Sequence, residues 1–201
     1  TIWSFGKEPE LSVTIEKHYF TGNGRVPNSR LPLLIYRQVL RGPEKAIEDA
    51  LRLNRWVPSW YSGEGMWPHH HFHSEAHEII MVTAGTHKGK FGGHDGREAT
   101  LHAGDVIVIP AGVGHMGRGI SDDLKVTGGF PLSNGIVDFR YGLPDEYDDC
   151  ARRAAEVPLE SFDPFFGLGG PLAQIWADAD RGVRRPEPEQ YDPALMTYLA
   201  A

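Results

Sequence analysis

The stretch 65–85, GMWPHHHFHSEAHEIIMVTAG, constrains this chain more than any other part of its sequence. His71 and His73 are separated by one residue, so on a β-strand both side chains point to the same face. Glu78 begins the run EIIMVT, whose β-branched residues favour a second strand. Residues 74–77 are enough for a tight turn that brings Glu78 back towards the two histidines. Two imidazoles and a carboxylate that converge in this way predict a site for a divalent transition metal.

A fourth ligand has to come from elsewhere in the chain, and residues 104–115, GDVIVIPAGVGH, contain a good candidate. This segment indicates a strand, then a Pro-Gly turn, and then a histidine that opens another strand. We therefore take His115 as the candidate fourth ligand.

Two other interpretations of the histidine run fit the sequence less well. Consecutive histidines can be the remnant of a purification tag, but tags lie at termini and do not contain a residue such as Phe72. His69 and His73, or His73 and His77, have the i, i+4 spacing of a helical zinc site. Pro68 precedes the run, however, and the apolar stretch after it is β-branched with no amphipathic helical period, so we prefer strands.

Together the two segments match both signatures of the cupin family, and the chain resembles that family. The first signature fits 65–85 at every position. It consists of Gly, five residues, His-x-His, four residues, Glu, six residues and Gly. The second signature fits 104–115 and consists of Gly, five residues, Pro-x-Gly, two residues and His. It usually ends in Asn four residues later, where this chain has Gly119. That departure concerns local strand packing, because the Asn is not a ligand in the family. The resemblance implies the metal ligands His71, His73, Glu78 and His115.

The frequency of short strands and turn signals indicates an all-β sandwich or barrel. The cupin resemblance implies a double-stranded β-helix, or jelly-roll barrel, with a few peripheral helices and the metal inside. We expect one cupin domain over 1–201, with the barrel core at about 56–131. N-terminal strands and a helix are expected in 11–55, and a C-terminal helix and wrap in 144–201.

The individual elements follow from apolar patterning and from Gly, Pro and Asp signals. The predicted strands outside the metal segment are 11–20, 31–40, 56–61, 97–102, 105–110 and 125–130. The predicted helices are 43–55, 144–156 and a last short one over 192–199. Residues 157–172 are expected to run across the barrel, and the charged, proline-rich segment 181–189 is expected to be loose.

The layout also resembles a group of bacterial stand-alone cupins, the YjlB-like proteins. This similarity rests on the strand that contains Tyr36, the run 69–73, the segment 104–115 and the pieces DP and GGPL within 163–172. It covers most of residues 11–176 and implies no established reaction.

Composition excludes several classes of function. The net charge is -7 and there is no basic stripe with interleaved aromatic residues, so we expect no nucleic-acid partner. No apolar run is long enough to cross a bilayer and no signal pattern is present, so we expect no membrane partner. Cys150 is the only cysteine, which fits a reducing compartment and a cytoplasmic location. A homodimer is expected, because pairing through exposed strand edges is common for such barrels.

Three neutral imidazoles and one carboxylate give a site of net charge +1 around a divalent ion, suited to Mn, Fe, Co, Ni, Cu or Zn. Four ligands complete a tetrahedral structural zinc site, whereas an octahedral centre keeps two positions open. The resemblance favours the second arrangement, and with it a metal-dependent enzyme that acts on a small molecule by dioxygenase-, isomerase- or lyase-type chemistry. His69, from strand parity, and Tyr36, from motif position, are the candidates for proton transfer or substrate orientation. The alternative is a non-catalytic sensor or ligand-binding cupin.

Overall fold

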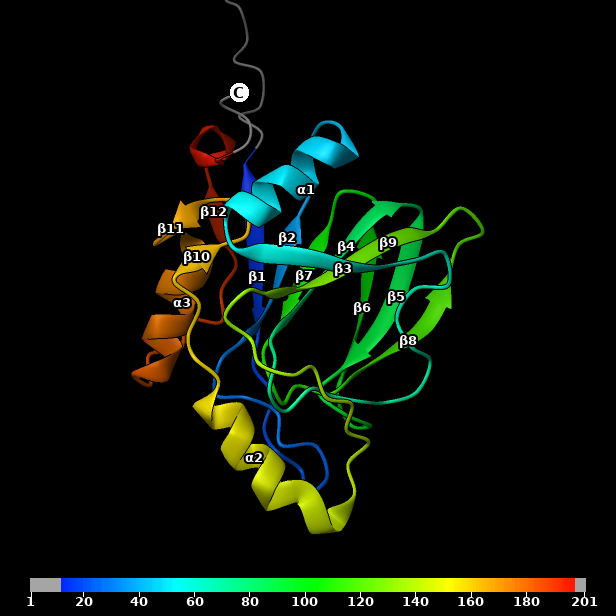
Figure 1. Cartoon of the computed structure of the whole chain (residues 1–201), viewed down its shortest axis with the longest axis vertical. Helices are drawn as coiled ribbons and strands as arrows, with labels where there is room; N and C mark the ends of the chain where they lie inside the picture. The colour runs from blue at the N-terminus through cyan, green and yellow to red at the C-terminus, as the bar shows by residue number, and fades with distance from the viewer. Residues whose placement is uncertain (1–11, 198–201) are drawn as a thin grey trace, which may run out of the picture.

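The larger sheet of this computed structural model, which describes residues 12–197, has seven antiparallel strands in the order β12-β1-β2-β7-β4-β9-β3 (Figure 1). These are β12 (Glu189–Tyr191), β1 (Val13–His18), β2 (Leu33–Arg37), β7 (Val106–Ile109), β4 (Glu78–Ala84), β9 (Lys125–Pro131) and β3 (Trp56–Ser62). A smaller antiparallel sheet has the order β6-β5-β8, formed by β6 (Arg97–His102), β5 (Thr86–Phe91) and β8 (His115–Ile120). The short strands β10 (Phe162–Asp163) and β11 (Gly167–Leu168) pair with each other. The all-β prediction is confirmed.

The central strands β2, β4 and β7 of the larger sheet are buried on both faces, which explains why they are apolar runs. Successive side chains of a strand point to opposite faces, so each run divides between two clusters. The inner cluster lies between the two sheets, and its members on β2, β4 and β7 are Leu33, Ile35, Ile80, Val82, Ile107 and Ile109. The outer cluster lies under the helices, and its members on the same strands are Leu34, Tyr36, Ile79, Met81, Val106 and Val108. A position's parity along its strand therefore decides whether it faces the barrel interior.

Strands from the predicted N-terminal part take a central place in this sheet. β2 pairs with β7 through Leu34–Val108, Ile35–Ile107 and Tyr36–Val106, and β1 pairs with β2. The barrel wall thus draws on residues N-terminal to the predicted core of 56–131.

Helices cover the outer face and one end of the sheets (Figure 1). They are α1 (Glu44–Leu53), the 3₁₀ turn η1 (Pro144–Glu146) continuing into α2 (Tyr147–Glu156), α3 (Pro171–Asp180) and the 3₁₀ turn η2 (Pro193–Leu195). The first two predicted helices are confirmed. Of the last predicted helix only η2 is described, capped by Asp192, which accepts a hydrogen bond from the Ala194 amide; residues 198 and 199 lie outside the described part.

The sequence prediction missed α3. Gly169, Gly170 and Pro171 favoured an irregular wrap, but a proline in the first turn of a helix sacrifices no hydrogen bond. The helix then buries a face of helical spacing against the outer cluster, consisting of Leu172, Ile175, Trp176 and Ala179. Tertiary burial therefore decides the structure of this segment.

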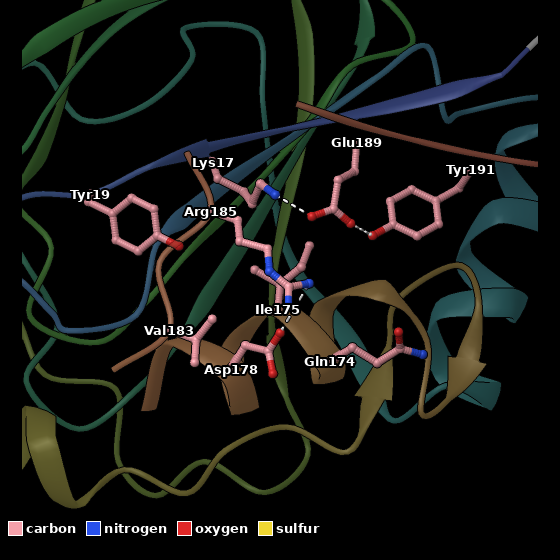
Figure 2. A pocket seen from close by; sticks show the side chains of 9 residues that line it. All are labelled: Lys17, Tyr19, Gln174, Ile175, Asp178, Val183, Arg185, Glu189 and Tyr191. Atoms are coloured by element: carbon pink, nitrogen blue, oxygen red, sulfur yellow. Dashed lines mark hydrogen bonds and ion pairs between the residues drawn. The ribbon is translucent and has the colours of Figure 1, made fainter. Parts of the chain in front are cut away.

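The edge strand β12 is attached to β1 by a half-buried ion pair, which Figure 2 shows. The Lys17 side chain is only 1% exposed, and its ammonium group lies against Glu189. The other carboxylate oxygen of Glu189 accepts a hydrogen bond from the Tyr191 hydroxyl. These contacts fix the end of the segment 181–189, whose other residues are irregular as the sequence predicts, beside a cavity of about 50 Å³.

His87 on β5 provides a test of pH-dependent stability. It is fully buried, its Nε2 accepts a hydrogen bond from the Met66 amide and its Nδ1 donates to the Gly119 carbonyl. Burial lowers the pKa of this imidazole. Below about pH 6.5, the pKa of a histidine in the unfolded chain, His87 takes up a proton in the unfolded chain but not in the folded protein. The free energy of unfolding therefore decreases as the pH is lowered.

We expect the stability gap between wild type and His87→Gln to narrow as the pH is lowered from about 8 to about 5, because only the wild type loses this contribution. Urea denaturation at a series of pH values measures it. A difference in the free energy of unfolding between wild type and His87→Gln that is constant across the pH series contradicts a lowered pKa of His87.

Candidate metal centre

Both sheets contribute to one cluster of side chains. Glu78 is the first residue of β4 and shares the inward parity of Ile80 and Val82. His115 is the first residue of β8 on the smaller sheet. His71 forms an isolated antiparallel bridge with His115, with hydrogen bonds in both directions between their backbones. The predicted regular strand through the histidine run is therefore wrong in detail, since this segment pairs only at single bridges.

The structure brings the four predicted ligands together. One coordinating atom from each of His71, His73 and His115 lies within 4.8 Å of the others. Glu78 Oε2 lies 3.3 Å from His73 Nε2 and 3.2 Å from His115 Nε2. All four side chains are buried, with exposures of 5% or less.

Each imidazole is oriented by its second ring nitrogen. Nδ1 of His71 donates to the carbonyl of His69, and Nδ1 of His115 donates to the carbonyl of Val113, both at 3.0 Å. Nδ1 of His73 donates to the carbonyl of Asp138. These contacts place the proton on Nδ1 and leave the Nε2 lone pair free, which is how a metal-binding histidine is prepared by its surroundings. Trp60 Nε1 donates to Glu78 Oε1 at 3.1 Å and fixes the carboxylate in the same way.

The resulting donor set fits a cation. With Nδ1 protonated, Nε2 of His115 is an acceptor, and it faces the carboxylate oxygen Oε2 of Glu78. Both atoms are buried and neither has a hydrogen-bond partner. Two acceptors 3.2 Å apart repel each other unless a positive charge lies beside both. Three imidazoles and a carboxylate suit a divalent transition metal in that position.

Burial and neighbouring charges shift the pKa values of the clustered side chains. Burial lowers the pKa of His71 to about 3, so this imidazole is neutral at physiological pH. Burial opposes the ionisation of Glu78, but hydrogen bonds and positive charge from the protonated forms of His115 and His73 hold the pKa of its carboxyl well below its ordinary value. For His73, burial acts to lower the pKa, and the neighbouring Glu78 outweighs it, so the pKa is raised. The Glu78 carboxylate is therefore ionised and able to bind a cation.

A pocket of about 450 Å³ opens beside three of the ligands, His71, His73 and Glu78. Its other walls are mainly aromatic and apolar, formed by Ser59, Trp60, Gly65, Trp67, Phe130, Val137 and Phe139. The size is that of a site for a small organic molecule.

Neither of the two residues predicted for proton transfer lines this pocket. Tyr36 has the outward parity of β2, is fully buried in the outer cluster, and donates its hydroxyl proton to Asp163 at 2.7 Å. We therefore do not retain a catalytic role for Tyr36. His69 is exposed and its ring lies 5.8 Å from that of Trp67, at the edge of the pocket; its proposed role stays a prediction.

Sequence reasoning missed the residues that surround the ligands. Trp60 carries no signal of a site residue in the sequence, and only its register on β3 next to β9 brings its indole to Glu78. Asp138 and Phe139 belong to the irregular segment 132–143 between β9 and α2, where no periodicity marks a site residue. The Phe139 ring stacks on His71 with centroids 5.3 Å apart and meets His73 edge-on at 4.9 Å.

Asp138 connects that segment to the ligand loop. Its carboxylate accepts hydrogen bonds from the amide and hydroxyl of Ser74 and from the Glu75 amide, and it pairs with Arg140 at 2.7 Å. The same residue supplies the carbonyl that orients His73.

Asp138→Ala keeps the backbone carbonyl that orients His73 but loses the carboxylate contacts to Ser74 and Glu75 that hold this carbonyl in place. We expect the variant to lower metal affinity by about 10-fold, because such outer contacts keep a ligand oriented. Titration with a competing chelator measures this, with Asp122→Ala in the exposed turn before β9 as the control. Equal affinities of the two variants contradict the role given to Asp138.

The chain belongs to the cupin family, and its two antiparallel sheets form the double-stranded β-helix of that family. Residues 61–127 match the family model described as Cupin domain. The chain is 34% identical over 163 residues to the "Uncharacterized protein YjlB" of Bacillus subtilis (strain 168), an alignment that covers 80% of this chain and 96% of that protein. In the described part of the chain, no helix is long and apolar enough to span a membrane.

Several solved structures resemble parts of the chain at low identity. A DUF861 family protein from Thermotoga maritima is 15% identical with a TM-score of 0.33, over 49% of this chain and 98% of that one. The TDP-quinovose 3,4-ketoisomerase WlaRB from Campylobacter jejuni is 13% identical with a TM-score of 0.36, over 46% and 72%. RmlC from Streptococcus suis, solved with dTDP-D-xylose, is 15% identical with a TM-score of 0.33, over 57% and 72%. Likeness at this level carries no information on the chemistry of this chain.

Proposed function

We propose that this protein binds a divalent transition metal and uses it as an enzyme on a small-molecule substrate. The ligands are His71, His73, Glu78 and His115. The observation that supports this most strongly is the buried, unpaired Glu78 Oε2 facing His115 Nε2, with a pocket for a small molecule directly beside the cluster. A purely structural zinc site has no need of such a pocket.

The roles of this chain's residues follow from their contacts. The four ligands hold the ion, and Trp60 and the carbonyls of residues 69, 113 and 138 keep their donor atoms aimed at it. Phe130 and Phe139 cover His73 and keep water away from the ligand side of the pocket. When bound, such a metal supplies Lewis-acid polarisation of a substrate oxygen, or redox chemistry if it is iron, copper or nickel, so dioxygenase-, isomerase- and lyase-type reactions are all compatible with the site.

A second candidate function is a non-catalytic sensor or ligand-binding cupin. One observation favours it: apart from the ligands, no residue that lines the pocket is a strong general acid or base. Ser59, the one hydroxyl there, donates to the carbonyl of Val57. On this reading the metal holds the ligand in place without turnover.

Metal content separates a metal protein from a metal-free one. We expect untagged wild-type protein to retain close to one transition-metal ion per chain and His71→Ala to retain almost none, because three donors hold a borderline ion much more weakly than four. His102→Ala, an exposed histidine on β6, is the matched control and should bind as wild type does. Elemental analysis after gel filtration gives the result, and equal metal content in wild type and His71→Ala contradicts the proposal.

Oxygen uptake and product analysis on the metal-loaded protein, with diols, catechols, keto acids and sugars, then distinguish the two candidates. Metal-dependent turnover supports the enzyme, whereas metal-dependent thermal shifts without turnover support the binding module.

We also propose that the protein works in the cytoplasm as a homodimer. The single cysteine, Cys150, is a buried free thiol, which suits a reducing compartment. The large apolar side chains Ile136, Phe139, Tyr141 and Leu143 are more than half exposed along one segment, and burial between two copies is one way to remove them from water. Light scattering in solution tests the dimer.

A further inference from the structure

We infer that the pocket beside the metal centre selects flat aromatic or conjugated molecules that present a hydroxyl or enol oxygen and carry no more than one negative charge. Phe139 is inferred to be a main determinant of this preference. The inference rests on the proposed function, because it names the class of molecule that meets the metal in that site.

Aromatic surfaces form the route to the ligands. Trp60, Trp67, Phe130 and Phe139 line the pocket, and the Phe139 ring lies nearly parallel to His71, at 23°, with centroids 5.3 Å apart. Phe130 and Phe139 both meet the His73 ring edge-on, at 5.8 and 4.9 Å. A molecule that enters this pocket meets aromatic walls, where a planar π-system gains offset-stacked or edge-to-face contacts as well as apolar burial.

The charges of the pocket limit the charge of its occupant. The only ionisable residues among those that line it are the ligands themselves; Ser59 and Gly65 add no charge, and no lysine or arginine is present. A divalent ion with the Glu78 carboxylate has a net charge of +1, because the imidazoles are neutral. One phenolate or enolate oxygen balances that charge. A second negative charge has no partner in an apolar pocket, and an unpaired buried charge is costly.

A second pocket that also borders His71 shows the contrast within the same molecule. It has a similar volume, about 470 Å³, but its lining includes Arg25, His70, His94 and Asp95. Charged and hydrogen-bonding groups are thus available close to the cluster, and they are placed away from the aromatic pocket. His94, which is exposed and lines only this second pocket, provides a control position.

Phe139 is suited to a selective role because its backbone is anchored through Asp138 while its side chain lies outside the core. The preceding residue, Asp138, is anchored by its hydrogen bonds to residues 74 and 75, whereas the Phe139 side chain is 55% exposed and packs mainly on the ligand imidazoles. Its truncation therefore removes a wall of the pocket without opening the core.

The test uses the full chain loaded with Co²⁺, whose visible absorption reports on what reaches the metal, with nitrocatechol, oxalate and thymidine diphosphate as probes. We expect nitrocatechol to bind about tenfold or more tightly than either of the others. Its flat ring carries the metal-binding oxygens directly, whereas oxalate has no ring to stack and the charge of thymidine diphosphate lies on a diphosphate. His115→Ala, without a complete metal site, should give no absorption change with any probe. Equal or tighter binding of oxalate or thymidine diphosphate overturns the inference.

Two variants test the residues. Phe139→Ala should weaken nitrocatechol binding about tenfold while retaining cobalt, and His94→Ala should leave it unchanged. Val137→Lys adds a cation to the pocket wall and should reverse the preference towards oxalate. Unchanged nitrocatechol affinity in Phe139→Ala, or an unchanged preference in Val137→Lys, contradicts the inference even when the metal is fully bound. Failure of the wild type to bind cobalt contradicts the proposed function instead, so the two failures are distinguishable.

Discussion

Replacing Glu78 by glutamine is expected to abolish metal binding and at the same time to stabilise the metal-free protein by about 1 kcal/mol at about pH 9. Metal binding is lost because the cluster then lacks its only negative charge. The metal-free protein gains because at that pH Oε2 of Glu78 faces lone pairs on His73 and His115, and both Oε2 and His115 Nε2 are buried without hydrogen-bond partners. A glutamine amide is nearly the same size, can donate to an imidazole there, and still accepts from Trp60.

The measurement is a pair of urea denaturation curves for wild type and Glu78→Gln, each with and without a chelator. The expected signature is a change of sign: the variant is the more stable protein without metal and the less stable one with metal, since only the wild type gains from ligand binding. Glu64→Gln, at an exposed position before the histidine run, is the control. It should leave the free energy of unfolding unchanged both with and without metal. A variant that is less stable in both conditions means that Glu78 is a structural carboxylate and not a metal ligand.

The largest effect on folding is expected at Asp163. This fully buried carboxylate accepts hydrogen bonds from the amides of Phe165 and Phe166 through Oδ1, and from the amide of Leu172 and the hydroxyl of Tyr36 through Oδ2. Burial raises the pKa of Asp163, and the four donors act against that rise. They tie the start of α3 and the β10–β11 segment to the outer face of the larger sheet.

We expect Asp163→Ala to lower the free energy of unfolding by about 4 kcal/mol or more, because buried donors are left without partners. Tyr36→Phe removes a single hydrogen bond and should cost only about 1 kcal/mol. Denaturation curves measure both, with Asp122→Ala in the exposed turn as a control near zero. Folded Asp163→Ala should still bind metal as wild type does, since Asp163 contacts the outer cluster and not the ligands. A loss below about 1 kcal/mol contradicts the anchoring role.

The sequence alone was sufficient for the family, the all-β class and the four residues that converge. Spacing is informative here because a cluster on a barrel needs its ligands at fixed points: two of the same parity before a turn, one at the start of the next strand, and one after a second turn. Each of those points carries a local signal, such as the Gly-rich ends of 65–85 and the Pro-x-Gly before His115. The signals are local, so they can be read without the fold.

The tertiary structure decided the rest. Tyr36 and Glu78 both lie on strands of the larger sheet, and only the register of that sheet shows that Glu78 faces the interior and Tyr36 faces the helices. α3 forms because it covers the outer cluster, although the glycines before it favour irregular structure. Two walls of the pocket, Val137 and Phe139, come from an irregular segment without periodicity. Contacts between distant segments depend on how sheets pair and pack, and no local pattern in the sequence encodes that pairing.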